Sequence, residues 1–251
     1  MKISSNDLLR YAKQIILKQV GILGQKKISS TKVLIVGMGG LGCPVALYLS
    51  NLGIKKIGIA DHDRVDLSNL NRQVLFNTSD IGKFKVIRAK KKLLKINKII
   101  KINIYKEKVV ERNIENILSK YDIICDCSDN FTTRYLLNNF CLKNKKILIS
   151  AAISKFEAHI FNFDFSKNIP CYRCFMPEIP EQENKCDTEG ILPTVAGIAG
   201  TLQANEVVKS ILDKKNELVG KMIVFNTLNL NFRKIKLTKN YNCITCCKQN
   251  D

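Results

Sequence analysis

Long apolar runs are absent from this 251-residue sequence. No stretch approaches the ~20 apolar residues that a membrane-spanning helix needs, and the N-terminus lacks the apolar core of a secretory signal peptide. We therefore expect no membrane segment and a cytosolic protein. Hydrophobic residues still make up 45% of the chain. Because they recur in clear periodic patterns, the chain is expected to fold into one α/β domain.

Acidic residues are scarce relative to basic ones. The chain has 41 Lys and Arg against 22 Asp and Glu, which gives a formal net charge of +19. Such an excess can indicate binding to nucleic acid or another polyanion. Here the excess is mostly lysine and is spread along the whole chain, so we interpret it as a solvated basic surface. We expect no nucleic-acid partner, and an acidic protein partner is compatible with this surface.

The sequence is organised around an apolar strand, 33–36, that runs into a glycine turn and a helix starting near Pro44. The spacing Gly37-x-Gly39-x-x-Gly42 fits a nucleotide-binding fingerprint. One glycine makes the tight turn, one lets the backbone approach a phosphate, and one lets helix and strand pack closely. The helix N-terminus then offers unpaired N–H groups to an anion. Glycine turns after strands are common, so this motif alone also fits a plain turn.

Acidic side chains at the ends of predicted strands favour a nucleotide-binding site over a plain turn. Asp61 follows the second predicted strand, roughly 20 residues beyond the glycines, where such folds hold a ribose hydroxyl. Asp63, Asp126 and Asp129 also lie at strand ends. In an open parallel sheet, ligands sit beyond the carboxyl ends of the strands. The sequence therefore predicts a nucleotide at this edge of the sheet.

Strands and helices alternate through residue 151, after which antiparallel strands are expected. This order predicts a Rossmann-like, doubly wound α/β fold with a mainly parallel sheet that continues into antiparallel strands. We expect a single domain, 1–251, with a nucleotide-binding half, 1–152, and a second half, 153–251. The expected elements are a helix capped by Asp7 and reaching about Val20, strands 33–36, 56–60, 101–106, 121–126 and 146–151, helices from 44, 83–96, 114–118 and from 131, antiparallel strands within 156–165, helix 194–212, and strands 222–225 and 232–237.

Ten cysteines in a cytosolic-looking protein indicate metal binding or catalysis before disulfides. Cys171-x-x-Cys174 and Cys243-x-x-Cys246 are two thiolate pairs that together complete a tetrahedron for a structural zinc ion. Redox dithiols and unrelated thiols are the alternatives, and Cys247 could replace Cys246 as a ligand. Four further cysteines lie in apolar contexts and are expected in the core: Cys43, Cys125, Cys127 and Cys141.

Cys186 stands apart, in the polar segment 177–193, which we expect to be a mobile loop. An exposed thiol beside Lys185 is a candidate nucleophile. An inert loop thiol fits the spacing equally well.

Together these motifs resemble the ubiquitin-activating-like adenylyltransferases of sulfur-carrier metabolism, the ThiF/MoeB/HesA group. The resemblance covers nearly the whole chain and rests on many motifs at once. They are Arg10-Tyr11-Ala12-Lys13-Gln14, Gly37–Gly42, Asp61-x-Asp63, Ser68-Asn69-Leu70-Asn71-Arg72-Gln73, Lys85, Asp126-Cys127-Ser128-Asp129-Asn130, Gly200-Thr201-Leu202-Gln203-Ala204 and the two cysteine pairs.

The resemblance implies an enzyme that uses ATP and Mg²⁺ to adenylylate the C-terminal Gly-Gly carboxylate of a small ubiquitin-like sulfur carrier protein. Pyrophosphate leaves, and the acyl-adenylate is ready to become a thiocarboxylate. Two anions must meet, so cations must neutralise them. The implied nucleotide-binding residues are Gly37, Gly39, Gly40, Gly42, Asp61 (on the ribose), Asp63, Ser68, Asn69, Arg72 and Lys85 (the last three on the phosphates), Gln73, Asp129 (on Mg²⁺) and Asn130; the implied catalytic residues are Lys13, Arg72, Lys85, Asp129 and Cys186.

The chain departs from the family pattern at Lys13, where the family has a second arginine in Arg-Tyr-x-Arg-Gln. In the family that arginine reaches across a homodimer to the partner's ATP. Lysine keeps the charge but loses the bidentate fork. We therefore expect a homodimer in which Lys13 keeps the role with weaker geometry.

Segments 75–81 and 177–186 look more like ThiF than MoeB. The expected substrate is therefore a ThiS-type carrier for thiamine thiazole biosynthesis, bound by the half 153–251. In that branch the cysteine matching Cys186 forms an acyl-disulfide with the carrier. The alternative is MoeB-type activation of the molybdopterin synthase small subunit, a MoaD-type carrier. No rhodanese-like domain follows the zinc site, so a separate persulfide protein is expected to donate sulfur.

Three readings of other classes compete. A nicotinamide oxidoreductase shares the glycines and Asp61, but the chain offers no evident hydride-site histidine. A zinc-ribbon nucleic-acid binder would use the basic charge, yet its cysteine pairs would not be so far apart with an apolar stretch between them. A non-catalytic carrier-binding scaffold would follow if Lys13 has disabled catalysis.

Overall fold

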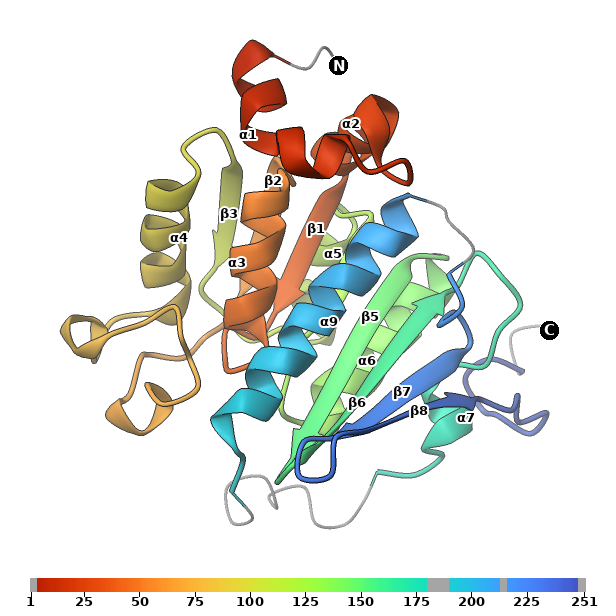
Figure 1. The fold of residues 1–251 in the computed structure, drawn as a ribbon. Helices are drawn as coiled ribbons and strands as arrows, with labels where there is room; N and C mark the ends of the chain where they lie inside the picture. Colours follow the sequence, from red (N-terminus) through yellow and green to blue (C-terminus); the bar gives the residue numbers. More distant parts are fainter. Residues whose placement is uncertain (1–3, 180–189, 213–215, 248–251) are drawn as a thin grey trace.

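The computed structural model describes residues 4–179, 190–212 and 216–247, and within these ranges its centre is one eight-stranded sheet (Figure 1). Five neighbouring strands are parallel, and three antiparallel strands extend the sheet from β5. This confirms the predicted fold class. In spatial order the strands are β3 (Lys101–Tyr105), β2 (Lys56–Ala60), β1 (Lys32–Val36), β4 (Ile123–Asp126), β5 (Ile147–Ser154), β6 (Glu157–Asp164), β7 (Lys221–Asn226) and β8 (Asn231–Lys236).

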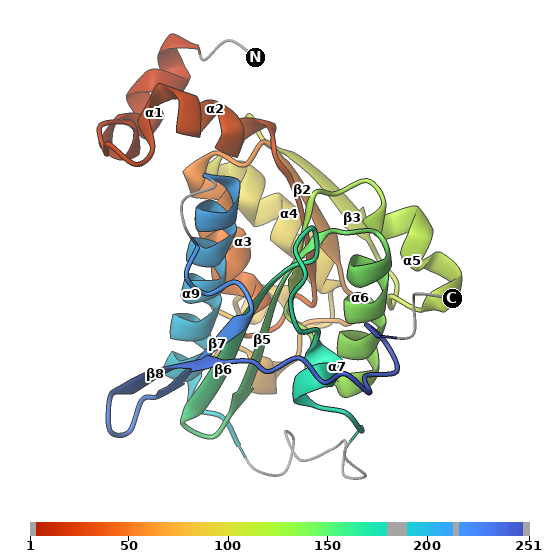
Figure 2. The same ribbon diagram turned by 90° about the vertical axis from the view of Figure 1, so that its right-hand side faces the viewer.

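Helices cover both faces of the sheet (Figure 2). Residues of α3, α4 and α9 share one core cluster with Val33 and Ile35 of β1, and residues of α5 and α6 share the other with Leu34 and Val36. Because side chains alternate along a strand, one apolar run supplies both cores. The helices are α1 (Ser5–Ile15), α2 (Gly21–Ser30), α3 (Gly42–Leu52), α4 (Lys85–Ile96), α5 (Glu111–Leu118), α6 (Phe131–Lys143), α7 (Tyr172–Phe175) and α9 (Pro193–Ile211), with short 3₁₀ turns η1 (Leu67–Asn69) and η2 (Thr78–Asp80).

The N-terminal helix differs from the prediction. Ser4, not Asp7, is the N-cap: the Ser4 hydroxyl accepts from the Asp7 N–H at 3.1 Å, and the Asp7 carboxylate accepts from the Ser4 N–H in return. Asp7 is thus the third residue of a capping box. The helix ends at Ile15 rather than near Val20, and the unpredicted α2 follows it.

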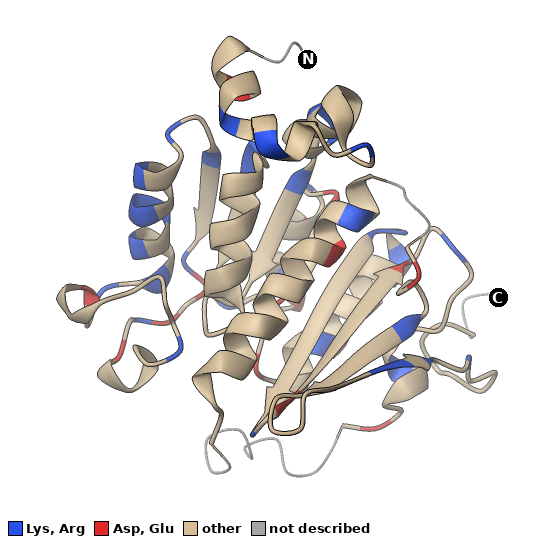
Figure 3. Cartoon of the chain, viewed as in Figure 1, with Lys and Arg blue, Asp and Glu red and all other residues tan. Residues whose placement is uncertain are grey.

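Other expected elements are present with shifted ends. The expected division at 152/153 falls inside β5, so one strand belongs to both halves. Most of the expected loop 177–193, including Cys186, lies outside the described residues. In the described ranges no helix combines the length and apolar character needed to cross a bilayer. Figure 3 shows the Lys and Arg residues distributed over several elements, with a run along α4.

Candidate functional site

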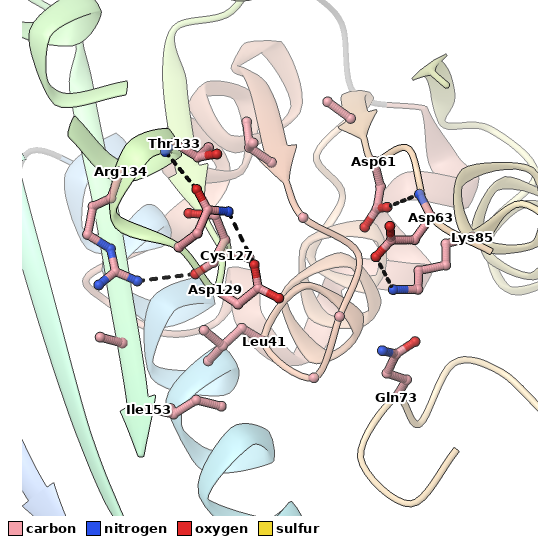
Figure 4. Close-up of a pocket in the computed structure, with 18 of the residues that line it drawn as sticks. Leu41, Asp61, Asp63, Gln73, Lys85, Cys127, Asp129, Thr133, Arg134 and Ile153 are labelled. Carbon is pink, nitrogen blue, oxygen red and sulfur yellow. Dashed lines mark hydrogen bonds and ion pairs between the residues drawn. The ribbon is translucent and has the colours of Figure 1, made fainter. Parts of the chain in front are cut away.

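A cavity of about 560 Å³ lies where β1, β2 and β4 end (Figure 4). Val36, Ala60 and Cys127, at or just beyond the ends of these strands, line it. The chain moves outward from β1 to β2 and β3, then returns to place β4 on the other side of β1. Ligands of open α/β sheets bind at such a reversal of strand order. The fold therefore puts the cavity where the sequence predicts a nucleotide.

The glycine loop forms one wall of this cavity. Gly37 has a φ of +91°, and a Cβ there would lie 2.5 Å from the Cys127 carbonyl oxygen. A Cβ on Gly42 would lie 2.0 Å from the Gly37 carbonyl oxygen, so any other residue would push α3 away from the strand. At Gly39 the nearest atom, on Gln73, is 4.0 Å away. The backbone at Gly39 is therefore open to a ligand.

The N-terminus of α3 adds to this wall. Its N-cap residue, Leu41, makes no side-chain hydrogen bond to the first turn and lines the cavity. The Cys43 N–H already donates to the Gly39 carbonyl oxygen at 3.1 Å, and Pro44 has no N–H, so the first turn offers an anion mainly the positive end of the helix dipole. A phosphate fits this environment.

Asp61 is held at the end of β2 with its carboxylate fixed. Its two oxygens accept the backbone N–H groups of Met38 at 2.6 Å and Asp63 at 2.7 Å. Each carboxylate oxygen retains acceptor capacity for a ligand hydroxyl. Gln73, also on the wall, is buried, and its side-chain oxygen has no partner among the described residues. Buried polar groups are normally hydrogen-bonded, so this orphan fits a bound ligand that donates to it.

Lys85, the first residue of α4, brings a cation to the same side of the cavity as Asp61 (Figure 4). Its side chain is buried, and Nζ lies 2.8 Å from the Asp63 carboxylate. Asp61, His62 and Asp63 also place possible ligand atoms within 4.8 Å of one another. Because Lys85 already neutralises Asp63, we assign no metal to that group.

The loop after β2 carries a second cation, Arg72, whose guanidinium donates to the Ser68 carbonyl oxygen at 2.9 Å. Asn69 and Arg72 line the cavity. Ser68 does not: its hydroxyl donates to Asp66 at 2.6 Å and stabilises the turn. Ser68 therefore shapes the loop that presents the other two.

Asp126 and Asp129 lie three residues apart in very different environments. Asp126 is completely buried and accepts from the Ser128 and Ser150 hydroxyls at 2.5 and 2.6 Å and from the Arg134 guanidinium at 3.3 Å. It is part of the structure beneath the cavity. Asp129 is exposed on the cavity wall, accepts from the Asn130 amide at 3.3 Å and has no ion pair with a described residue. An exposed carboxylate there fits Mg²⁺, which prefers oxygen ligands.

Several cavity residues were not predicted. Arg134 is buried, and although burial alone would lower its pKa, the Asp126 carboxylate and Tyr172 hold it above its usual value. Glu157 and His159 on β6 form a contact of 2.9 Å at the far end of the cavity. Arg134 could have been suspected because it lies one helical turn after Asn130, which caps α6 through a 2.8 Å bond from the Thr133 N–H. Glu157 and His159 needed the sheet register.

The structure therefore brings together most of the predicted nucleotide residues but not every predicted site residue. Lys13 is exposed on α1, at the end of the sheet where β1 begins, whereas the cavity lies where β1 ends (Figure 1). Cys186 lies outside the described residues. Gly42 packs behind the loop rather than lining the cavity. The predicted residues that do line it are Gly37, Gly39, Gly40, Asp61, Asp63, Asn69, Arg72, Gln73, Lys85, Asp129 and Asn130.

Four cysteines from the second half of the chain, Cys171, Cys174, Cys243 and Cys246, lie close together. The Sγ distances are 4.0 Å for Cys171–Cys174, 3.7 Å for Cys171–Cys243 and 3.3 Å for Cys174–Cys246. Sulfurs about 2.3 Å from a tetrahedral zinc ion lie about 3.8 Å apart, so this cluster could hold zinc. Cys247 Sγ lies 3.9 Å from Cys246 Sγ, but it donates to the Asn240 carbonyl oxygen at 3.3 Å and does not belong to the group of four sulfurs that all lie within 4.8 Å of one another. The fourth candidate ligand is thus Cys246.

The four cysteines expected in the core are there. Cys43, Cys125, Cys127 and Cys141 are all buried. Burial raises the pKa of the Cys43 thiol to about 12, and it moves the pKa of the other three well above the usual range. These thiols are therefore protonated and apolar at neutral pH, as core residues should be.

Comparison with known protein families matches residues 11–245 to the ThiF family. The chain belongs to the ThiF family. It is 40% identical over 248 residues to a protein of Culex quinquefasciatus named adenylyltransferase and sulfurtransferase MOCS3, covering 98% of this chain and 56% of that one. The MOCS3 protein of Dictyostelium discoideum is 38% identical, with coverage of 96% and 57%. This ThiF-family chain thus spans a little over half the length of the curated relatives it matches.

Solved structures agree with this membership. The microcin C7 biosynthetic enzyme MccB in complex with N-formylated MccA superposes with a TM-score of 0.84 at 25% identity, covering 97% of this chain and 77% of that one. E. coli MccB with ATP superposes with a TM-score of 0.82, also at 25% identity, covering 94% and 74%. The fold around the cavity is therefore one that occurs in a solved ATP complex.

Proposed function

We propose that this chain is an ATP-dependent adenylyltransferase that activates the C-terminal glycine carboxylate of a ubiquitin-like sulfur carrier protein. The observation that carries the proposal is the composition of the cavity. An open glycine turn, a helix N-terminus, Lys85, Arg72 and Asp129 all line one space, with Lys85 and Asp129 on either side of the turn (Figure 4). The adenylyltransferase name of relatives at 38–40% identity and the ATP complex of E. coli MccB support it.

In the proposed reaction, a carboxylate oxygen of the carrier attacks the α-phosphorus of ATP. The bond from that phosphorus to the oxygen bridging the α- and β-phosphates breaks, and pyrophosphate leaves with the bonding electrons. Lys85 and Arg72 neutralise the phosphates, and Asp61 orients the ribose through its fixed carboxylate. Positioning and charge neutralisation supply most of the catalysis in phosphate transfer. Mg²⁺, held by Asp129, would add further positive charge on the phosphates.

The carrier is proposed to be MoaD-type. The ThiF-like look of segments 75–81 and 177–186 favours a ThiS-type carrier, but the MOCS3 relatives favour the MoeB-type alternative over nearly the whole chain. We therefore place the MoaD-type carrier first and the ThiS-type carrier second. The half 153–251 is proposed to bind the carrier, and a persulfide protein is proposed to supply sulfur. Cys186 as an acyl-disulfide residue belongs to the second possibility.

Two further features complete the proposal. The cysteine cluster holds a structural zinc ion, because its four thiols leave no open position for a substrate. The chain works as a homodimer in which Lys13 reaches the partner's nucleotide. Its exposure and its distance from the cavity of its own chain support a role in trans.

ATP–pyrophosphate exchange tests the function. The purified chain would be incubated with Mg²⁺, ATP, labelled pyrophosphate and either a MoaD-type or a ThiS-type carrier. We expect exchange with the MoaD-type carrier and none with the same carrier lacking its last glycine, because the attacking carboxylate is then displaced. Exchange only with the ThiS-type carrier would keep the reaction and reverse the order of substrates. Exchange with neither carrier would contradict the proposed function and favour a scaffold.

A further inference from the structure

Arg134 lies between the cavity and the cysteine cluster and contacts both sides. On the cavity side, where Figure 4 shows Arg134, its Nη2 donates to the carbonyl oxygens of Ser128 and Ala151, each at 3.1 Å, while Nε donates to Asp126. The Ser128 carbonyl belongs to the peptide bond that leads into Asp129. Arg134 therefore fixes the backbone immediately before the exposed carboxylate of the cavity.

On the other side Arg134 contacts Tyr172, the residue after the first cysteine of the cluster. Arg134 Nη1 donates to the Tyr172 hydroxyl at 3.4 Å, and the guanidinium carbon lies 5.6 Å from the ring centroid, within cation–π range. The Tyr172 N–H donates to the Asn138 side chain at 2.8 Å. Arg134 and Asn138 are four residues apart on α6, so one helix face holds both ends of this tyrosine.

Tyr172 has few other polar anchors. It lies in α7, a four-residue helix whose N-cap is Cys171 and whose third residue is Cys174, and it is otherwise packed by aromatic rings such as Phe161 and Tyr135, with centroids 5.5 Å away. A metal on the four sulfurs would fix this short helix at its N-cap and at its third residue. Without it, Tyr172 would be placed by ring packing, by its two contacts to α6 and by the Met176 N–H, which donates to its carbonyl oxygen at 2.9 Å.

We propose that Arg134 is a positioning residue that couples the cysteine cluster to the nucleotide cavity. The cluster places Tyr172, Tyr172 places the guanidinium, and the guanidinium places the Ser128–Asp129 backbone. The contacts form a continuous chain of buried groups, in which a buried guanidinium that loses one partner must shift to find another. This inference rests on the proposed binding of a nucleotide in the cavity, and it assigns the cysteine cluster a part in that binding.

Amide hydrogen exchange tests the coupling without a nucleotide. The Ser128 N–H donates to the Asp126 carboxylate at 3.0 Å and reports on this turn. We expect that removing the metal with a chelator speeds amide exchange in residues 127–130 several-fold. The Asp63 N–H, which donates to Asp61 on the other side of the cavity from Ser128, should keep its exchange rate. Unchanged exchange at residues 127–130 after complete loss of zinc would overturn the proposal.

A double-mutant cycle with nucleotide affinity provides the second test. Arg134→Lys keeps a charge for Asp126 but loses the fork that spans Ser128 and Tyr172; Cys246→Ser removes a cluster thiol. We expect each single substitution to weaken binding of a non-hydrolysable ATP analogue about five- to fifty-fold. The double variant should lose much less affinity than the product of the two single fold-changes. Zinc content should fall in Cys246→Ser and stay intact in Arg134→Lys. A product of the two single effects would overturn the coupling.

Asn162→Ala is the matched control for lost stability. Asn162 is buried and bonds Glu206 and Ser210 between β6 and α9, away from Arg134. Combined with Arg134→Lys, Asn162→Ala should lower thermal stability. The affinity loss of this double variant should equal the product of the two single fold-changes. The two hypotheses fail separately. If the parent chain binds no nucleotide, the proposed function is contradicted and hydrogen exchange decides the coupling. If the parent binds the nucleotide but the effects of Arg134→Lys and Cys246→Ser simply multiply, the coupling alone is contradicted.

Discussion

Lys85 and Asp63 form an ion pair at the edge of the cavity in which the two partners are unequally exposed. Lys85 Nζ lies 2.8 Å from the Asp63 carboxylate, and the side chains are 6% and 49% exposed, respectively. A buried lysine requires an anionic partner. When a triphosphate enters the cavity, it can take over part of that role, because Nζ has three donors. Under the proposed function, the pair keeps a cation in place for the phosphates before ATP arrives.

Replacing Lys85 tests this role. We expect Lys85→Ala to lower the rate of carrier adenylylation on the order of 10²–10³-fold, as for the loss of one preorganised donor, and to raise the KM for ATP. Lys83→Ala is the matched control, since Lys83 bonds the Ser79 carbonyl oxygen at 2.6 Å and does not line the cavity. Pyrophosphate exchange measures both. Equal rates for the two variants would show that Lys85 serves only the structure.

Lys13 offers a test of the proposed homodimer with shared active sites. We expect Lys13→Ala to lose on the order of 10²-fold in pyrophosphate exchange, and Lys13→Arg to match or exceed the parent because the fork returns. Lys18→Ala, a nearby exposed lysine, should change little. Mixing Lys13→Ala with Lys85→Ala subunits should restore activity, because one of the two sites in a mixed dimer is intact. Mixtures as inactive as their components would contradict a role in trans.

The cysteine cluster predicts a difference between two adjacent thiols. Cys246→Ser should lose bound zinc and unfold at lower denaturant concentration, because one ligand of four is gone. Cys247→Ser should retain both, since Cys247 bonds Asn240 instead of completing the cluster. Metal analysis with denaturant unfolding of the two proteins distinguishes them. Zinc loss in Cys247→Ser with retention in Cys246→Ser would reverse the ligand assignment.

Asp80 predicts a pH-dependent part of the stability. Its buried carboxylate accepts from Arg88 at 2.5 Å, from the Asn77 N–H at 3.1 Å and from Lys92. Burial alone would raise its pKa, but Lys92, the Asn77 N–H and Arg88 together lower it below the usual 3.8. A lowered carboxyl pKa stabilises the fold above the usual value, and that stability is lost as pH falls through the folded-state pKa.

Asp80→Asn should therefore cost about 3–5 kcal/mol at neutral pH, as for breaking a buried pair. The difference from the parent should shrink as pH falls below 3.8. Urea unfolding at a series of pH values measures it. Glu217→Gln, in an exposed pair with Lys234, is the control and should show little change at any pH. A difference that stays constant with pH would mean that the Asp80 carboxylate does not contribute through its charge.

Local features of the sequence determined much of this protein. The turn at Gly37 and the packing at Gly42 follow from glycine's missing side chain, because no other residue fits those positions. The cysteine pairs could be recognised from the sequence because two thiols three residues apart already form half of a metal site. The strands and most helices followed from apolar periodicity, which chain-neighbouring residues alone produce.

Tertiary structure decided what depends on residues far apart in the chain. The helix α2 contains two glycines and was not predicted; it forms where Gly24 lets Leu212, beyond the end of α9, approach closely. Only packing separates buried Asp126 from exposed Asp129, since burial depends on Ser150 and Arg134 rather than on neighbours in sequence. The choice of Cys246 over Cys247, and the position of Arg134 between cavity and cluster, follow from how α6, α7 and the C-terminal segment meet. Sequence spacing carries no record of such contacts, because they join residues brought together only by the complete sheet.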